Sequence, residues 1–197
     1  MIVAMPDTPD ASELPGALRE AELVAQMLPG SVTLTGPQAT HDNVLGMLPR
    51  HPIVHLACHG LSDRTAPANS KLLLYDHSSR PLTVAAISRL RISDADLAYL
   101  SACSTTISSQ RLADEALHIT TAFQLAGYPH VIGTLWPIAD ADAVHVANEI
   151  YAHLTDDGAA MPATERTAHA LHLATRRLRD QNPAGPTLWA AHLHAGA

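Results

Sequence analysis

The chain has 197 residues, of which 47% are hydrophobic, and its formal net charge is −7. A chain of this length can fill one domain, burying about 70% of the surface that its unfolded form exposes. It contains no basic run, and its longest apolar runs have the length of strands, so we expect neither a nucleic acid ligand nor a membrane span.

Short apolar runs alternate along the chain with segments of helical periodicity. Runs of this length, bounded by loop residues, are typical of buried strands in a parallel sheet. The expected strands cover residues 2–5, 31–35, 53–60, 97–104, 131–136 and 188–193, and a small hairpin covers 72–75 and 82–84. The expected helices cover residues 18–28, 40–48, 85–90, 112–126, 140–154 and 164–179. This alternation predicts an α/β domain with a mostly parallel sheet and helices on both faces.

Two of the expected strands stop abruptly in reactive residues, His59 and Cys103. The carboxyl ends of parallel strands meet at one edge of a sheet, where functional groups lie. A thiol beside an imidazole is a nucleophile beside its base, so we predict that Cys103 and His59 form the catalytic pair of a cysteine peptidase. The backbone N–H groups of Gly60 and Cys103 are the expected oxyanion donors. Taken alone, each of the two side chains also fits an inert place in the core.

Cysteine content and the first residues predict the compartment. Only Cys58 and Cys103 occur, which is few for a secreted protein that relies on disulfides. The first six residues lack the basic and extended apolar regions of a signal peptide. We therefore expect a cytoplasmic protein with reduced thiols.

The 13 histidines raise the question of a metal site. His169 and His172 are spaced to share a helix face, and His192 and His194 alternate on an expected strand. Neither pair has an obvious third ligand, and structural zinc requires four, so we expect no metal. The sequence also lacks a glycine-rich phosphate loop, and we expect no cofactor.

Several segments together resemble the CHAT domain, a family of caspase-like peptidases related to caspases and separase. The segments that carry the resemblance are His59-Gly60, Leu100-Ser101-Ala102-Cys103, Ala126-Gly127 and the run from Val131 to Asp140. Residues 14–22, 69–74 and 188–191 resemble the family's early helix, its hairpin and its last strand. The resemblance spans nearly the whole chain.

The resemblance implies a caspase-like three-layer α/β sandwich and hydrolysis of peptide bonds without a cofactor. The family's catalytic histidine and nucleophile fall on His59 and Cys103. The substrate is then a partner protein cut at a specific site, and a sensor or partner regulates the cleavage. In the related separases an acidic residue helps to hold a basic P1 side chain, and the matching positions are Asp140 and Asp142. Asp140 fits equally well as a plain helix N-cap, whereas the small Ser101 leaves room for the substrate peptide beside the thiol.

The sequence departs from the family in two ways. Cys58 stands where the family has threonine, and as a strand neighbour of His59 it is expected to pack in the core. The family's module begins roughly a hundred residues earlier, so we interpret residues 1–197 as one peptidase domain without the usual N-terminal portion. A sheet without its neighbouring strands exposes an edge, which predicts a homodimer or a regulatory protein partner. The alternative function is a catalytically silent interaction module of the same fold.

Overall fold

The computed structural model of the chain describes residues 1–63, 65–101, 103–104 and 112–196, and for residues 103–104 and 112–117 it describes the backbone alone. A six-stranded sheet in the order β10-β9-β7-β3-β1-β2 crosses this part of the chain. All its neighbouring strands run parallel except β10, which pairs antiparallel with β9. Its strands are β1 (Ile2–Ala4), β2 (Thr33–Thr35), β3 (Ile53–Ala57), β7 (Leu97–Leu100), β9 (His130–Thr134) and β10 (His192–Gly196).

A second, smaller sheet continues from the carboxyl ends of two central strands. It has the order β6-β5-β4-β8 among the described residues. Its strands are β4 (His59–Leu61), β5 (Lys71–Leu73), β6 (Leu82–Thr83) and β8 (Cys103–Ser104). The antiparallel pairing of β5 with β6 confirms the predicted hairpin.

The two apolar runs that were each predicted as one strand are divided between the two sheets. The first run leaves the larger sheet after Ala57 and re-enters strand structure at His59. The second leaves it after Leu100 and re-enters at Cys103. The predicted single strands were therefore too long, because an apolar run does not mark the point at which a chain changes sheets.

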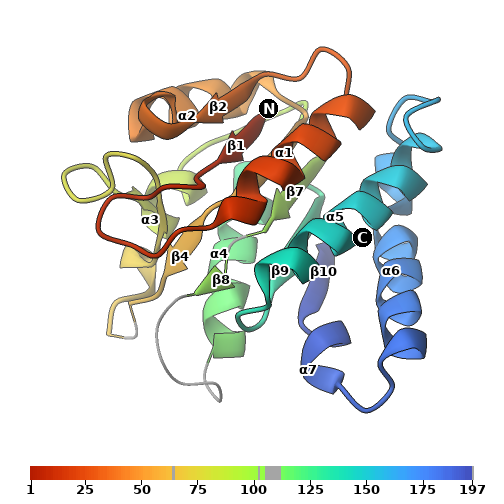
Figure 1. Ribbon diagram of the computed structural model, residues 1–197. Helices are drawn as coiled ribbons and strands as arrows, with labels where there is room; N and C mark the ends of the chain where they lie inside the picture. The colour runs from red at the N-terminus through yellow and green to blue at the C-terminus, as the bar shows by residue number, and fades with distance from the viewer. Residues whose placement is uncertain (64, 102, 105–111, 197) are drawn as a thin grey trace.

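Helices cover both faces of the larger sheet (Figure 1). On one face lie α1 (Pro15–Met27), α5 (Asp140–Thr155) and α6 (Thr167–Gln181). On the other lie α2 (His41–Met47), α3 (Val84–Ser88) and α4 (Leu112–Ala126). This arrangement of layers is the three-layer sandwich expected from the sequence.

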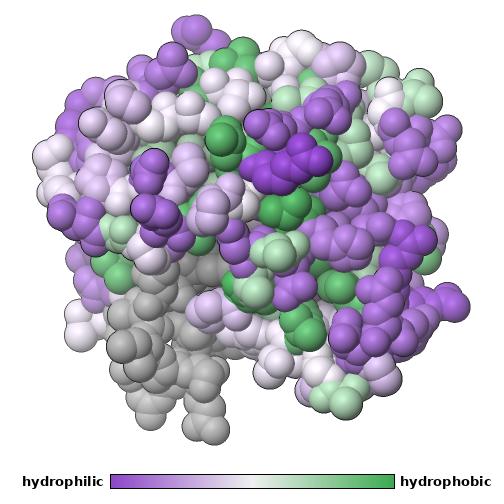
Figure 2. All heavy atoms as spheres, in the orientation of Figure 1, coloured by the Kyte–Doolittle hydropathy of each residue, from purple (hydrophilic) through white to green (hydrophobic). Residues whose placement is uncertain are grey.

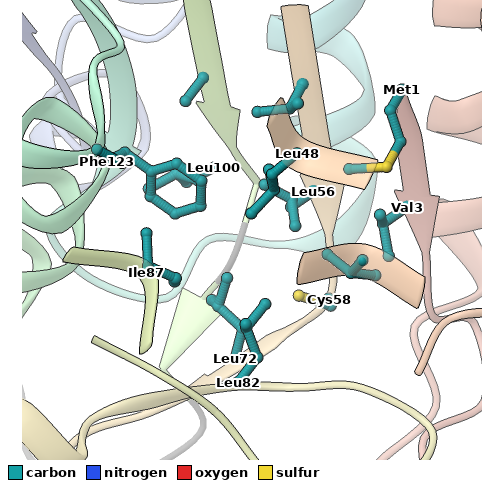
Figure 3. Close-up of a cluster of buried hydrophobic side chains, with 14 of the residues drawn as sticks. Met1, Val3, Leu48, Leu56, Cys58, Leu72, Leu82, Ile87, Leu100 and Phe123 are labelled. Carbon is teal, nitrogen blue, oxygen red and sulfur yellow. The ribbon is translucent and has the colours of Figure 1, made fainter. Parts of the chain in front are cut away.

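Each face of the sheet has its own hydrophobic core. The core beneath α2, α3 and α4 brings Val3, Leu56 and Leu100 of the sheet together with Ile87 and Phe123 of the helices (Figure 3). Cys58 belongs to this core and has no exposed surface, which confirms its predicted packing role. On the helix-covered face that Figure 2 shows, hydrophilic and hydrophobic residues are interspersed.

Local sequence signals account for some of the element boundaries and not for others. The Thr40 side chain accepts a hydrogen bond from the Asn43 N–H and caps α2, as predicted. Asp140 was considered as the N-cap of α5, but that position is Ala139 and Asp140 is the first helical residue. The expected strand 188–193 was also wrong in its first half, where the short helix α7 (Pro186–Trp189) precedes β10. Pro186 favours this helix because proline suits the first helical position, where its missing N–H costs nothing.

The first strand of the chain lies inside the larger sheet. β1 pairs with β2 on one side and with β3 on the other, so the edge strands among the described residues are β2 and β10. The open edge of the sheet and the partner that it would pair with stay predictions. Within the described residues, no helix is both long and apolar enough to cross a membrane.

Candidate active site

His59 and Cys103 are register partners in the smaller sheet. β4 and β8 run parallel, pairing the Cα atoms of His59 and Cys103 and those of Gly60 and Ser104. The strands that precede them, β3 and β7, are also parallel neighbours. Two adjacent strands thus leave the larger sheet and pair again beyond it; β4 and β8 are labelled in Figure 1. This second pairing brings the backbones of the two predicted catalytic residues side by side.

The His59 side chain is 1% exposed and is oriented by a backbone carbonyl. Its Nε2 lies 2.7 Å from the carbonyl oxygen of Ser12. A carbonyl oxygen only accepts hydrogen bonds, so this contact assigns the proton of the neutral ring to Nε2. Nδ1 then carries the lone pair, and within the described part of the chain it has no hydrogen-bond partner. The ring is therefore held with its proton-accepting nitrogen unoccupied.

The loop that supplies this carbonyl, residues 6–14, is itself anchored. The Nε2 of the buried His77 lies 2.7 Å from the carbonyl oxygen of Pro9. The N–H of Leu14 donates to the carbonyl oxygen of Pro6 across the base of the loop. Two histidines from the smaller sheet and its hairpin thus contact carbonyl groups of one loop, which fixes the position of the Ser12 carbonyl above His59.

Gly60, the predicted oxyanion donor, is buried in β4. A Cβ built at this position would approach the Ile119 Cδ1 at 4.0 Å and meet nothing closer among the described residues. Steric crowding by the described residues therefore does not require a glycine at position 60. The proposed use of its N–H, like that of the Cys103 N–H, stays a prediction.

A small cavity of about 40 Å³ lies at the carboxyl ends of β3 and β7. Its lining residues are Leu14, Ala17, Glu20, Ala57, Ser101, Ile138, Asp140 and Ala143. Ser101 and Asp140, two of the three predicted substrate-binding residues, are thus brought together, whereas Asp142 lies in the first turn of α5 outside the lining. A volume of this size holds little more than a water molecule, so the cavity is narrower than an amino-acid side chain.

Asp140 contacts the start of α1 from the start of α5. Its carboxylate accepts a hydrogen bond from the backbone N–H of Gly16, in the first turn of α1. The first N–H groups of a helix have no partner within the helix and attract negative charge. Asp140 therefore caps a helix other than its own.

Sequence reasoning missed a buried polar cluster that begins at the wall of this cavity. The Glu20 side chain of α1 is almost completely buried, and its Oε2 accepts a hydrogen bond from the Ser101 Oγ at 3.0 Å. Its Oε1 lies 3.0 Å from the Nε2 of His55. The available signal was an acidic residue on the helix face that also carries Ala17, Ala21 and Val24. A carboxylate on a buried stripe requires a partner, and the sequence did not indicate where that partner lay.

One close pair of histidines joins β9 and β10. Among the described residues, no three His, Cys, Asp or Glu side chains are grouped closely enough to hold a metal ion. The Nδ1 of His130 lies 3.2 Å from the Nε2 of His194, and the two rings stack across β9 and β10. This contact joins two neighbouring strands and offers two nitrogens rather than the four that a structural zinc site needs.

The fold defines the class of protein to which the chain belongs, the proteins with a caspase-like α/β fold. The sheet of mostly parallel strands with helices on both faces matches the caspase-like α/β fold. The CHAT domain model matches residues 1–197, and the chain belongs to the CHAT domain family. No curated protein matches the sequence significantly.

Two solved structures share this fold. One is the crystal structure of the Arg-specific cysteine proteinase gingipain R (RgpB), with a TM-score of 0.57 and 13% identity over 99% of this chain. The other is the complex of Porphyromonas gingivalis RgpB pro- and mature domains, with a TM-score of 0.56 and 12% identity, again over 99% of this chain. The aligned region is 45% and 46% of those two chains, so this chain spans less than half of either. At such identities the likeness concerns the fold.

Proposed function

We propose that this protein is a cysteine endopeptidase in which Cys103 is the nucleophile and His59 is the general base. The observation that carries the proposal is the register pairing of these two residues in β4 and β8. Support comes from the unoccupied Nδ1 of His59 and from membership of the CHAT family, whose fold is shared by cysteine proteinases.

The proposed reaction begins with transfer of the thiol proton of Cys103 to Nδ1 of His59. The thiolate attacks the carbonyl carbon of the substrate, and the N–H groups of Gly60 and Cys103 donate to the resulting oxyanion. The Ser12 carbonyl holds the ring in place and stabilises the imidazolium through Nε2. The imidazolium then protonates the leaving amine, and water hydrolyses the thioester to release the acid.

The substrate in this proposal carries a positively charged residue at P1. Glu20 and Asp140 line the cavity at the carboxyl ends of β3 and β7, and no Lys or Arg is among its lining residues. Gingipain R, which shares the fold, is described as Arg-specific. Because the cavity is narrower than a side chain, substrate entry moves Asp140 away from Gly16. In this proposal Asp142, which lies in the same first turn of α5 as Asp140, adds negative charge, and Ser101 lies beside the P1 residue.

The natural substrate in this proposal is a partner protein that is cut at a specific site. A regulatory protein or a second copy of the chain controls the cleavage, and the narrow cavity supports a need for such control. Light scattering tests this part, because a chain that stays monomeric at all concentrations contradicts control by self-association.

The direct test is covalent labelling with a peptidyl ketone that carries Arg at P1, followed by mass spectrometry of the intact protein. We expect one label on the wild type, none on Cys103→Ala, and a strongly slowed reaction on His59→Ala. Cys58→Ala is the matched control, since the Cys58 side chain is buried in the core and its loss leaves labelling intact. Equal labelling of the wild type and Cys103→Ala contradicts the proposal and favours the catalytically silent module.

A further inference from the structure

A buried cluster of polar side chains connects the core of the protein with the end of β7. Glu20 is 2% exposed and His55 has no exposed surface. The His55 Nε2 lies 3.0 Å from the Glu20 Oε1, and the His55 Nδ1 lies 3.3 Å from the Tyr151 hydroxyl. The cluster thus joins α1, β3 and α5, three elements that are far apart in the sequence.

The contacts within the cluster differ in kind. The Tyr151 hydroxyl and the His55 Nδ1 form a hydrogen bond at 3.3 Å, whereas the His55 Nε2 and the Glu20 Oε1 are in contact at 3.0 Å without hydrogen-bond geometry. Burial, and secondarily the negative charge of Glu20, raise the pKa of Tyr151, which keeps this hydroxyl protonated. The His55 ring also stacks on Tyr99, its register partner in β7, with the ring centres 4.8 Å apart. The Glu20 carboxylate thus lies between His55, which contacts Oε1, and Ser101, which donates to Oε2.

The second carboxylate oxygen of Glu20, Oε2, binds the chain where it leaves the larger sheet. The Ser101 Oγ donates to the Glu20 Oε2 at 3.0 Å. Ser101 directly follows β7, and Cys103 begins β8 two residues later. A buried carboxylate is costly, and an apolar residue would complete the face of α1 that carries Ala17, Ala21 and Val24. Packing therefore does not explain why this position holds glutamate.

We propose that Glu20, held by His55, is a positioning residue for the nucleophile: through Ser101 it fixes the junction between β7 and β8 and thereby the place of Cys103 relative to His59. This inference rests on the proposed function. Displacement of a reacting group by about 1 Å can lower a rate by about a hundredfold, so a single hydrogen bond at this junction is enough to control reactivity.

The test separates positioning of the nucleophile from recognition of the substrate. A small haloacetamide reports the reactivity of Cys103 without occupying the cavity, whereas the Arg-containing peptidyl ketone reports reactivity and binding together. The variants are Glu20→Gln, Ser101→Ala and their combination, and the matched control is Glu22→Gln on the exposed side of the same helix. Alkylation of the Cys103 peptide is followed by mass spectrometry, and circular dichroism checks that each variant is folded.

We expect Glu20→Gln and Ser101→Ala each to slow alkylation by the haloacetamide about tenfold or more, while the half-saturating concentration of the peptidyl ketone changes less than about twofold. The double variant should lose little more than either single variant, because both substitutions act on the same contact: Glu20→Gln weakens it by removing the charge of the acceptor, and Ser101→Ala removes it. Glu22→Gln should react as the wild type does. If Glu20→Gln does not fold, Ser101→Ala still decides the question, because its small side chain is only half-buried.

Two results overturn the inference. In one, both single variants react with the haloacetamide at the wild-type rate. In the other, only the half-saturating concentration of the peptidyl ketone rises, which assigns Glu20 to substrate binding. A third result concerns the proposed function itself. If Cys103 is alkylated no faster in the wild type than in His59→Ala, both the proposed function and this inference are overturned. Failure of the proposed function can therefore be distinguished from failure of the inference alone.

Discussion

The carboxylate of Asp140 accepts a hydrogen bond from the backbone N–H of Gly16, so the first residue of α5 caps α1. Neither helix has a side-chain hydrogen bond from its own N-cap residue, and α1 has no acidic residue in its first turn. The contact therefore supplies charge that α1 lacks, and it closes one side of the cavity beside Ser101. This hydrogen bond therefore stabilises the start of α1 and, in the proposed function, also limits access of the substrate to the cavity.

Gly16→Ala should destabilise the protein by about 1–3 kcal/mol, because a Cβ at this position would lie 2.5 Å from the Asp140 carboxyl group and displace it. Gly46→Ala in α2 is the matched control, since its Cβ would meet nothing within 4 Å. Alanine favours helix over glycine, so this control should gain about 0.5–1 kcal/mol. Urea denaturation measures both free energies of unfolding. Equal gains in the two variants would show that Gly16 and Asp140 are not in contact.

Asp140→Asn should weaken the preference for a positively charged P1 residue. The amide oxygen can still accept from Gly16, so stability is largely kept while the negative charge is lost. A lost hydrogen bond to a charged group corresponds to about 1.5–3 kcal/mol, or roughly ten- to a hundredfold in kcat/KM for an Arg substrate. The measurement compares peptides with Arg and Ala at P1. An unchanged ratio would remove Asp140 from the specificity site.

Gly127→Ala should be strongly destabilising. Gly127 ends α4 with a φ of +126°, and a Cβ there would lie 2.2 Å from the Ile92 carbonyl oxygen. We expect a loss of more than about 2 kcal/mol, seen as a lower Tm in calorimetry. Gly30→Ala, at a φ of +82° with nothing within 4 Å, isolates the backbone cost of roughly 1–2 kcal/mol. Similar losses in both variants would mean that the approach to Ile92 is not close in solution.

The stability of the protein should fall as the pH is lowered from about 6.5 toward 4. Burial lowers the pKa of His192 to about 4 in the folded state. Between the folded and unfolded pKa values the unfolded chain holds more protons, so acidification favours unfolding. The pKa of His194 is lowered as well, by burial and by His130, and adds to the same fall.

His192→Asn isolates the contribution of His192, which we expect to be on the order of 2 kcal/mol between these pH values. The measurement is the free energy of unfolding of both proteins as a function of pH. His118→Asn, at an exposed position in α4, is the control for the exchange of a histidine for an asparagine as such. Parallel profiles for the wild type and His192→Asn would contradict the assignment.

Most of the architecture could be predicted from hydrophobic patterning. The short apolar runs located the strands of the larger sheet, and helical spacing located α1, α4, α5 and α6 to within a few residues. The errors have local physical causes. The hydrophobic residues Leu188 and Trp189 are compatible with a strand or with a helical turn. Pro186 favours the helical turn, because proline suits the first helical position. The break at Cys58 leaves no trace in the pattern because Cys58 is as buried as the strand residues before it.

The site could be predicted only where chemistry is carried by side chains. His59 and Cys103 were found because reactive residues ended apolar runs, and their backbones do lie side by side. The Ser12 carbonyl could not be found, because every residue has one and only the path of the loop selects it. The Glu20–His55 contact joins residues that are far apart along the chain, so it depends on the packing of α1 against β3. Most of the loop that follows Cys103, residues 105–111, lies outside the described residues.

Hydrolysis of a peptide library is the most direct test of the central claim that Cys103 and His59 form a peptidase site. Purified protein is incubated with the library, and mass spectrometry identifies the new termini. We predict that the wild type cleaves the library, preferentially after Arg or Lys. Cys103→Ala and His59→Ala should not cleave it, whereas Cys58→Ala should cleave it as the wild type does. Cleavage that persists in Cys103→Ala, or that is absent from a wild type supplied with its regulatory partner, would contradict it.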